Sequence, residues 1–112
     1  MSLFRRRREQ ASPRQPHPDA RVEAELQRIL SLRAVIARKE ALLASDHVQV
    51  TDLRRKVFLH PNWDDAPAWR TMIAALQEEA EQVEAEVAKL HDEIATRIGK
   101  IDDSDLAWLD NH

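Results

Sequence analysis

WRTMIAALQEEAEQVEAEVAKLHDEI, residues 69–94, decides the fold of this 112-residue chain. Apolar side chains recur through it at alternating steps of three and four residues, namely Trp69, Ile73, Leu76, Ala80, Val83, Val87, Leu90 and Ile94. With about 3.6 residues per turn, an α-helix places all of them on one narrow seam. A sustained repeat of about 3.5 residues is typical of a coiled-coil contact. We therefore predict a helix near 66–98 that packs through this coiled-coil seam.

A second helical pattern precedes this one, from a predicted N-cap at Asp19 to about residue 59, with a break around 45–51 left open. One row of this helix contains Val22, Leu26, Ile29, Ile36 and Leu43, with Arg33 and Glu40 inside it. Four further apolar residues fall outside that row: Leu30, Leu32, Val35 and Leu42. The apolar arc then exceeds half the circumference, so we expect this helix to contact more than one neighbour.

Residues 60–67 separate the two helical patterns. Pro61 lacks an N–H and restricts His60 to non-helical conformations, which ends the first helix. Asp64 and Asp65 favour the positive end of a new helix, and Pro67 is tolerated in its first turn. A short connection makes the two helices antiparallel neighbours, so the sequence predicts a helical hairpin.

Charge supports pairing the two helices with each other. Residues 69–98 contain seven acids and three bases, whereas residues 19–44 contain four acids and five bases. We predict an all-α fold, a long antiparallel helical hairpin or coiled coil over 19–101. We further expect it to assemble as a homodimeric four-helix bundle, because one partner helix cannot cover the wide face of the first helix. The predicted oligomer interface consists of Ile29, Leu30, Leu32, Val35, Ile36, Leu42 and Leu43.

The two ends of the chain have opposite charge. Residues 1–18 contain Arg5, Arg6, Arg7 and Arg8 with three prolines, and we expect a disordered basic tail there. These arginines, with a second cluster at Arg54, Arg55 and Lys56, are candidate phosphate contacts on nucleic acid or anionic lipid. The alternative for the tail is a solvated segment or a tether to an acidic patch of the same protein. The alternative for the second cluster is a solvated helical face.

Residues 102–112 are predicted to form an acidic C-terminal tail, grouped with the N-terminal segment as disordered apart from one short motif. Within it Ser104 can cap a single turn, and the candidate partner-binding residues are Asp105, Leu106, Trp108 and Leu109. Apolar anchors among acids suit a basic, apolar groove on another protein. The alternative is that Trp108 folds back onto the end of the protein's own bundle.

Several classes of function are not indicated. The chain has no cysteine, so disulfides and thiolate metal sites are excluded, and we expect a cytoplasmic protein. No apolar run approaches the roughly 20 residues that span a bilayer. No helical histidine shares a face with carboxylates at ligand spacing, and Asp64 and Asp65 are interpreted as caps. Without a phosphate-binding glycine loop or an activated nucleophile, we predict no enzyme, cofactor or metal.

Three functional hypotheses follow. The first is a non-enzymatic protein–protein interaction or assembly module that self-associates and binds partners through its charged ends. The second is a nucleic-acid-associated protein that uses the N-terminal arginine cluster, which the overall negative charge disfavours. The third is a hairpin that inserts its acidic tip, Asp64 and Asp65, into a larger enzyme. In outline this is similar to bacterial transcript-cleavage factors, and the two tip acids alone carry that resemblance.

Overall fold

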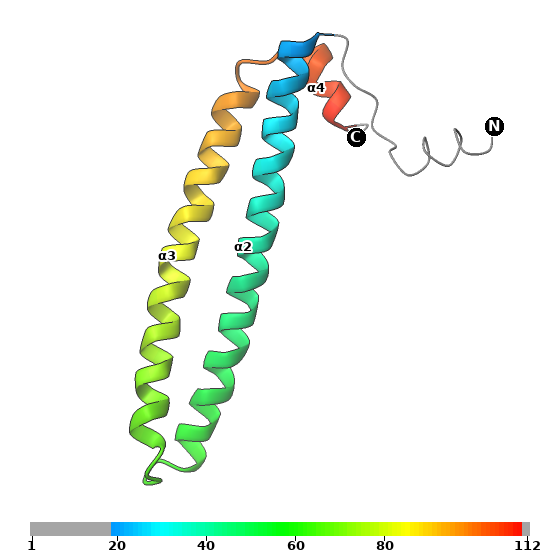
Figure 1. Cartoon of the computed structure of the whole chain (residues 1–112). Coiled ribbons are helices and arrows are strands. Elements are labelled where there is room, and N and C mark those ends of the chain that lie inside the picture. Colours follow the sequence, from blue (N-terminus) through cyan, green and yellow to red (C-terminus); the bar gives the residue numbers. More distant parts are fainter. Residues whose placement is uncertain (1–18, 111–112) are drawn as a thin grey trace, which may run out of the picture. The chain divides into compact units, whose positions relative to one another are not determined.

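The computed structural model describes residues 19–110, which form three helices and contain no strand: α2 Ala20–Leu59, α3 Ala66–Ile98 and α4 Asp103–Asp110 (Figure 1). The prediction of an all-helical protein is confirmed for this part of the chain. The predicted basic tail at 1–18, with Arg5–Arg8, lies outside the described residues, as do residues 111–112.

α2 begins and ends where local chemistry predicts. Asp19 caps it, because its Oδ1 accepts the backbone N–H of Arg21 at 2.9 Å and that of Val22 at 3.5 Å. No Gly or Pro interrupts α2, which continues unbroken through 45–51. The helix ends at Leu59, just before Pro61, the residue without an N–H.

Residues 60–65 form the turn between α2 and α3. The N–H of His60 still donates to the carbonyl of Lys56 at 2.9 Å, and the N–H of Ala66 donates to the carbonyl of Trp63 at 3.0 Å. Asp65 stands directly before α3, and its carbonyl accepts the first helical bond, from Trp69 N–H at 3.0 Å. This is the position of an N-cap residue.

The chain divides into two compact units, and each is described by itself. The larger unit spans residues 32–93. The described part of the smaller unit comprises residues 19–31 and 94–110. Both units therefore contain a stretch of α2, and α3 likewise contributes to both.

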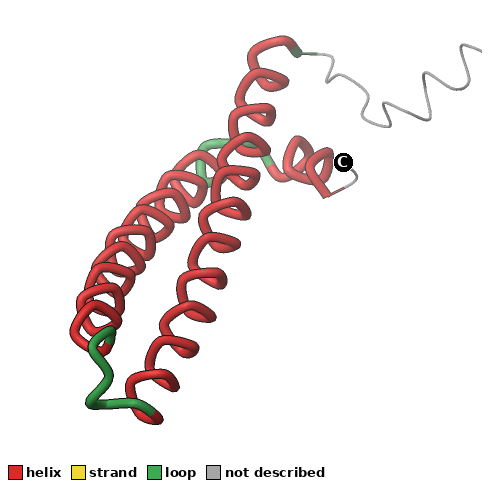
Figure 2. The backbone as a smooth tube through the Cα atoms, turned by 60° about the horizontal axis from the view of Figure 1, so that its bottom comes forward, coloured by secondary structure: helices red, strands yellow, loops and turns green. Residues whose placement is uncertain are grey.

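The larger unit is an antiparallel helical hairpin. Its stretches of α2 and α3 run side by side in both views (Figures 1 and 2). On α3, the alternating three- and four-residue steps mark the side turned inward, with Ala66, Ala80 and Val83 buried. Half-buried on the same side are Trp69, Ile73, Leu76, Val87 and Leu90.

The α2 side of the hairpin corrects the sequence analysis. Arg33 and Glu40, which were placed inside the apolar row, are exposed. Leu32 is buried and Lys39 is half-buried instead. The inward row steps by three and four through Ile29, Leu32, Ile36, Lys39, Leu43, Asp46, Val50 and Leu53. Two possible rows of α2 share Ile29, Ile36 and Leu43: one also contains Arg33 and the other also contains Leu32. In the structure the row with Leu32 faces inward, and Arg33 is exposed to water.

The smaller unit has its own apolar centre. Leu26 and Ile29 of α2 are fully buried, and Ile94 of α3 and Leu109 of α4 are nearly so. An ion pair joins two of its elements, with Arg97 Nη1 donating to Glu25 Oε1 at 2.7 Å. Apolar burial provides most of the stabilisation here, because a partly exposed ion pair contributes little.

The C-terminal segment contains the predicted helical turn with Leu106, Trp108 and Leu109, and the helix is longer than the single turn expected within an acidic tail, because it spans Asp103–Asp110. The carbonyl of Asp102 accepts the N–H groups of Asp105 and Leu106, both at 3.0 Å, so α4 begins at Asp103 and the cap position is Asp102, two residues before the predicted cap Ser104. Leu109 is buried and Trp108 is half-buried. Apolar contacts of α4 within its unit explain why so short a helix forms.

Candidate interaction surfaces

Two polar residues occupy the inward row of α2 in the larger unit, Lys39 and Asp46. Lys39 Nζ pairs with Glu86 Oε2 across the hairpin. Asp46 is only 2% exposed, and its Oδ2 has no hydrogen-bond partner. A buried carboxylate oxygen without a donor costs free energy and is rare in folded proteins. Asp46 is therefore the most unusual residue of the described seam.

Glu79 of α3 is a titratable residue that interacts with Asp46. A hydrogen bond with the Asp46 side chain, together with the negative charge of Asp46, raises the pKa of Glu79 above its ordinary value. Such a bond between two carboxyl groups needs a proton, which the two groups share when it is bound. Glu79 itself is exposed to solvent.

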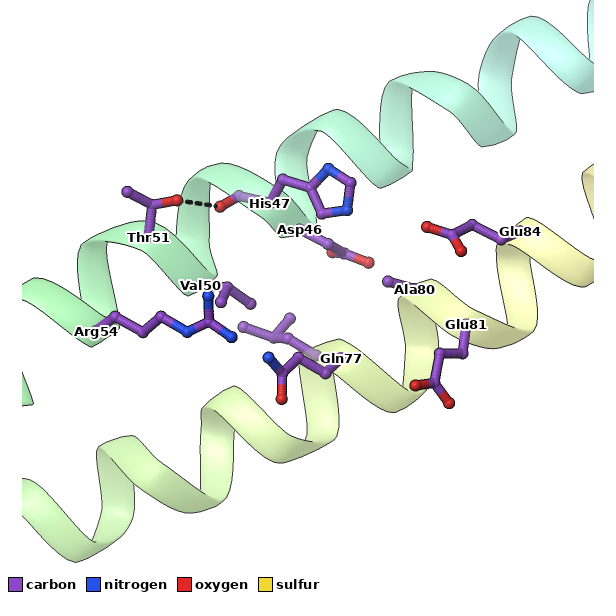
Figure 3. Close-up of a pocket in the computed structure, with 10 residues that line it drawn as sticks. Asp46, His47, Val50, Thr51, Arg54, Gln77, Ala80, Glu81 and Glu84 are labelled. Carbon is purple, nitrogen blue, oxygen red and sulfur yellow. Dashed lines mark hydrogen bonds between the residues drawn. The ribbon is translucent and has the colours of Figure 1, made fainter.

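A groove of about 490 Å³ runs beside Asp46 between the two helices of the larger unit. Figure 3 shows Asp46 directed from α2 toward α3, with Ala80 opposite it and Glu84 at one end of the groove. Arg54 lines the other end. Along α2, the Thr51 hydroxyl donates to the carbonyl of His47 at 2.9 Å, which holds this wall in place. The groove thus has an acidic end and a basic end.

The tip of the same hairpin exposes large apolar side chains. Phe58 is 84% exposed, the highest value among the large hydrophobic residues that the structure describes. Three others of the tip are about half exposed: Leu59, Trp63 and Met72. Scattered exposed hydrophobic residues are ordinary, whereas several near one turn make this end of the hairpin a candidate contact surface. We call these four residues the tip patch.

Aromatic contacts order the turn beneath the tip patch. The rings of His60 and Trp63 stack with centroids 3.6 Å apart and planes 14° apart. Trp63 also meets Trp69 at 6.1 Å with a tilt of 48°. Lys56 Nζ lies 6.0 Å from the centre of the Trp69 ring, within cation–π range. Trp63 is therefore held by neighbours although it is half exposed.

The predicted basic cluster flanks this tip. Arg54, Arg55 and Lys56 are all exposed on the last turns of α2. The acids of the tip, Asp64 and Asp65, are exposed as well. The tip of the hairpin therefore has apolar, basic and acidic side chains close together in the sequence. No group of three or more His, Asp or Glu side chains within residues 19–110 is arranged to hold a metal ion.

The predicted dimer interface is mostly turned into the chain's own units. Ile29, Leu32 and Ile36 are buried. Leu43 is half-buried, as are Leu30 and Val35, and Leu42 alone of the seven is classed as exposed, at 43%. The premise that Leu32 would stand in water without a second copy is therefore wrong.

The candidate partner-binding residues of the C-terminus are not free of their own unit. Leu109 is buried, while Asp105, Leu106 and Trp108 are half-buried. A partner that used Leu109 as an anchor would first have to displace it. Partner binding through α4 stays a prediction with that added requirement.

The sequence analysis did not single out Asp46 or the tip patch as functional. Asp46 follows Leu43 by three residues. It therefore belongs to the row of α2 that contains Leu32, and choosing that row would have predicted the burial of Asp46. Phe58 directly follows Val57, and only their positions around the helix tell which one faces inward. The stacked His60 and Trp63 have no periodic signal because they lie in the turn.

Among the helices of residues 19–110, none has an apolar stretch long enough to cross a lipid bilayer. The comparisons with known proteins identify no relative: no protein-family model, no curated protein and no solved structure matches this chain.

Proposed function

We propose that this chain is a non-enzymatic helical interaction module that binds another protein through the tip of its hairpin. The supporting observation is the tip patch, where Phe58, Leu59 and Trp63 stand largely in water beside three basic residues. Burying an exposed side chain of this size is worth roughly 1.5–3 kcal/mol. Exposed aromatic residues with neighbouring arginines are the composition found at binding hot spots.

The chemistry of the tip indicates what kind of surface it fits. An apolar pocket would receive Phe58, which projects furthest into solvent. Acidic groups at the rim of that pocket would meet Arg54, Arg55 and Lys56, and such rim charges act mainly on the rate of association. Trp63 is already held against His60, so little side-chain entropy is lost when it is buried.

Self-association as a homodimer is the second part of the proposal. A dimeric four-helix bundle through Leu32 is no longer supported, since Leu32 is buried within the chain. The apolar surface that a second copy can cover is the tip patch, with Leu42 and Val48 as further exposed positions on α2. If the partner at the tip is a second copy, the dimer contact is there and not on the predicted face.

Cross-linking from the tip tests the proposal. A photoreactive phenylalanine analogue replaces Phe58 in one variant and Val48, which is 62% exposed on the same helix, in a control variant. We expect a defined protein cross-linked at position 58 and not at position 48. The purified partner should then bind Phe58→Ser at least tenfold more weakly than Val48→Ser. Equal binding by both variants would contradict the proposal.

The alternative partners give different outcomes in the same system. A nucleic acid would bind with an affinity that falls steeply with salt and with Arg54→Gln and Arg55→Gln. A larger enzyme that receives an acidic tip would be insensitive to Phe58→Ser and sensitive to Asp64→Asn with Asp65→Asn. Sedimentation equilibrium at tens of micromolar separates a second copy from any other partner.

A further inference from the structure

Three exposed charged side chains along the groove form no ion pair within residues 19–110. Glu81 and Glu84 of α3 both line the groove. They are three residues apart on one face of the helix, so their like charges repel each other. Arg54 of α2 lines the groove as well, beside the uncharged side chains of Val50, Thr51 and Gln77. The groove therefore carries two acids and a base that its own hairpin does not bring together.

The opposite charges lie at opposite ends of the groove. The groove extends over residues 46–54 of α2 and 76–84 of α3, which is about 12 Å of each helix at about 1.5 Å per residue. Because the two helices are antiparallel, Arg54 lies at the end away from Glu84, and Gln77 lies between the two ends (Figure 3). A surface that is basic at one end and acidic at the other is complementary to its own copy in the reversed direction.

We infer that this groove docks on the same groove of a second copy of the chain, with the two hairpins antiparallel. A two-fold axis through the middle of the groove reverses its direction, so the basic end of one copy faces the acidic end of the other. Arg54 of each copy then meets Glu81 and Glu84 of the other copy, and the contact occurs twice. This contact rests on the self-association part of the proposed function, and it does not depend on the tip patch.

The floor and the middle of the groove suit such a contact. Val50 and Ala80 are buried and Leu76 is half-buried, so the floor is apolar, and the small alanine allows a close approach. At the two-fold axis Gln77 meets Gln77 of the other copy. An amide side chain has both donors and acceptors, so it can hydrogen-bond to an identical side chain. The floor contributes apolar burial, while the two charge contacts select the antiparallel orientation.

Exchanging the charges between two variants of the full chain tests the contact. One variant carries Arg54→Glu, and the other carries Glu81→Lys with Glu84→Lys. Each variant alone places like charges at both contacts, so its dimer dissociation constant should rise roughly tenfold or more above that of the native chain. An equimolar mixture restores opposite charges at both contacts and should form a heterodimer about as tightly as the native dimer. Sedimentation equilibrium measures all four samples. Circular dichroism checks that these exposed substitutions leave the helix content unchanged.

A cross-link at the two-fold axis locates the contact independently. The sequence has no cysteine, so Gln77→Cys introduces a single thiol at the position that should meet its own copy. Gln82→Cys is the matched control, because Gln82 is an exposed glutamine of the same helix that does not line the groove. With a short bismaleimide we expect most of the Gln77→Cys chains to become covalent dimers and the Gln82→Cys chains to stay largely uncoupled. Equal coupling of both variants would overturn the inference.

The remaining outcomes separate this contact from the proposed function. A native chain that is a monomer at tens of micromolar would overturn both the groove contact and the homodimer, and would leave binding of another protein at the tip unaffected. A dimer that Phe58→Ser dissociates and the charge variants leave intact would place the self-contact at the tip, which overturns the groove contact and supports the proposed function. A mixture of the two charge variants that stays monomeric would also overturn the groove contact.

Discussion

The two sides of the hairpin seam differ in composition. On α3 the inward positions of the larger unit are all apolar or alanine, from Ala66 to Leu90. On α2 the inward row includes Lys39 and Asp46, and each meets a glutamate of α3. An apolar row determines which side of a helix is buried. A polar residue within that row determines which residue of the other helix must lie opposite it. The α2 side therefore fixes the register of the hairpin, at a cost in stability.

The largest expected effect tests which phase of α2 is buried. Leu32 is 3% exposed and Leu42 is 43% exposed. Leu32→Ala should lower the free energy of unfolding by about 2–5 kcal/mol, because it removes buried surface and leaves a cavity. Leu42→Ala should cost roughly 0.5–1 kcal/mol. Urea unfolding followed by circular dichroism measures both, and equal losses would show that α2 packs through a different row.

The next prediction concerns the cost in stability of burying Asp46. Asp46→Leu replaces a buried carboxylate by an apolar side chain and should raise the free energy of unfolding by roughly 1–4 kcal/mol. Asp52→Leu, at an exposed position of the same helix, is the matched control and should change it by about 0.5 kcal/mol or less. Destabilisation by Asp46→Leu would mean that the bond between Asp46 and Glu79 contributes more stability than burial of the carboxylate costs.

The sequence predicts α3 better than α2 for a physical reason. On α3, apolar periodicity, the turn residues and the acids before the helix all agree, so its bounds and inward side follow from the sequence. On α2, Leu30, Leu32 and Leu42 fit more than one phase, and the choice depends on packing against α3. Burial of Asp46 opposite Ala80 follows only once the row of α2 that contains Leu32 is known to face inward. The burial of Leu109, which makes α4 part of a folded unit, likewise depends on packing.

The third prediction concerns pH. Because the pKa of Glu79 is raised in the folded state, the folded hairpin binds this proton more tightly than the unfolded chain does. The stability from this group is fully present below the ordinary pKa of 4.5 and is lost as the pH rises through the raised pKa. Thermal unfolding of the native chain and of Glu79→Gln should therefore differ in pH dependence as the pH rises above 4.5.

The control for the pH experiment is Glu78→Gln, an exposed neighbour whose unfolding should follow the native pH dependence. Asp46→Asn should abolish the Glu79 effect, since the Asp46 carboxylate is its cause. Identical pH profiles for the native chain and Glu79→Gln would show that no proton is shared at this position.

The smallest expected effect is at the other polar position of the seam. Lys39 and Glu86 pair across the hairpin with side chains 30% and 51% exposed. A pair so open to water contributes about 0–1 kcal/mol, and salt weakens it as the Debye length falls from about 10 Å at 0.1 M to about 3 Å at 1 M. A double-mutant cycle with Lys39→Met and Glu86→Gln should give a coupling within that range that shrinks in high salt.

Lys39→Met alone should be neutral or stabilising, because the aliphatic stem stays in the seam while the charge is removed. A salt-independent coupling of several kcal/mol would instead show that the charge of Lys39 is removed from water, as that of Asp46 is. Ion pairs would then hold the α2 side of the seam.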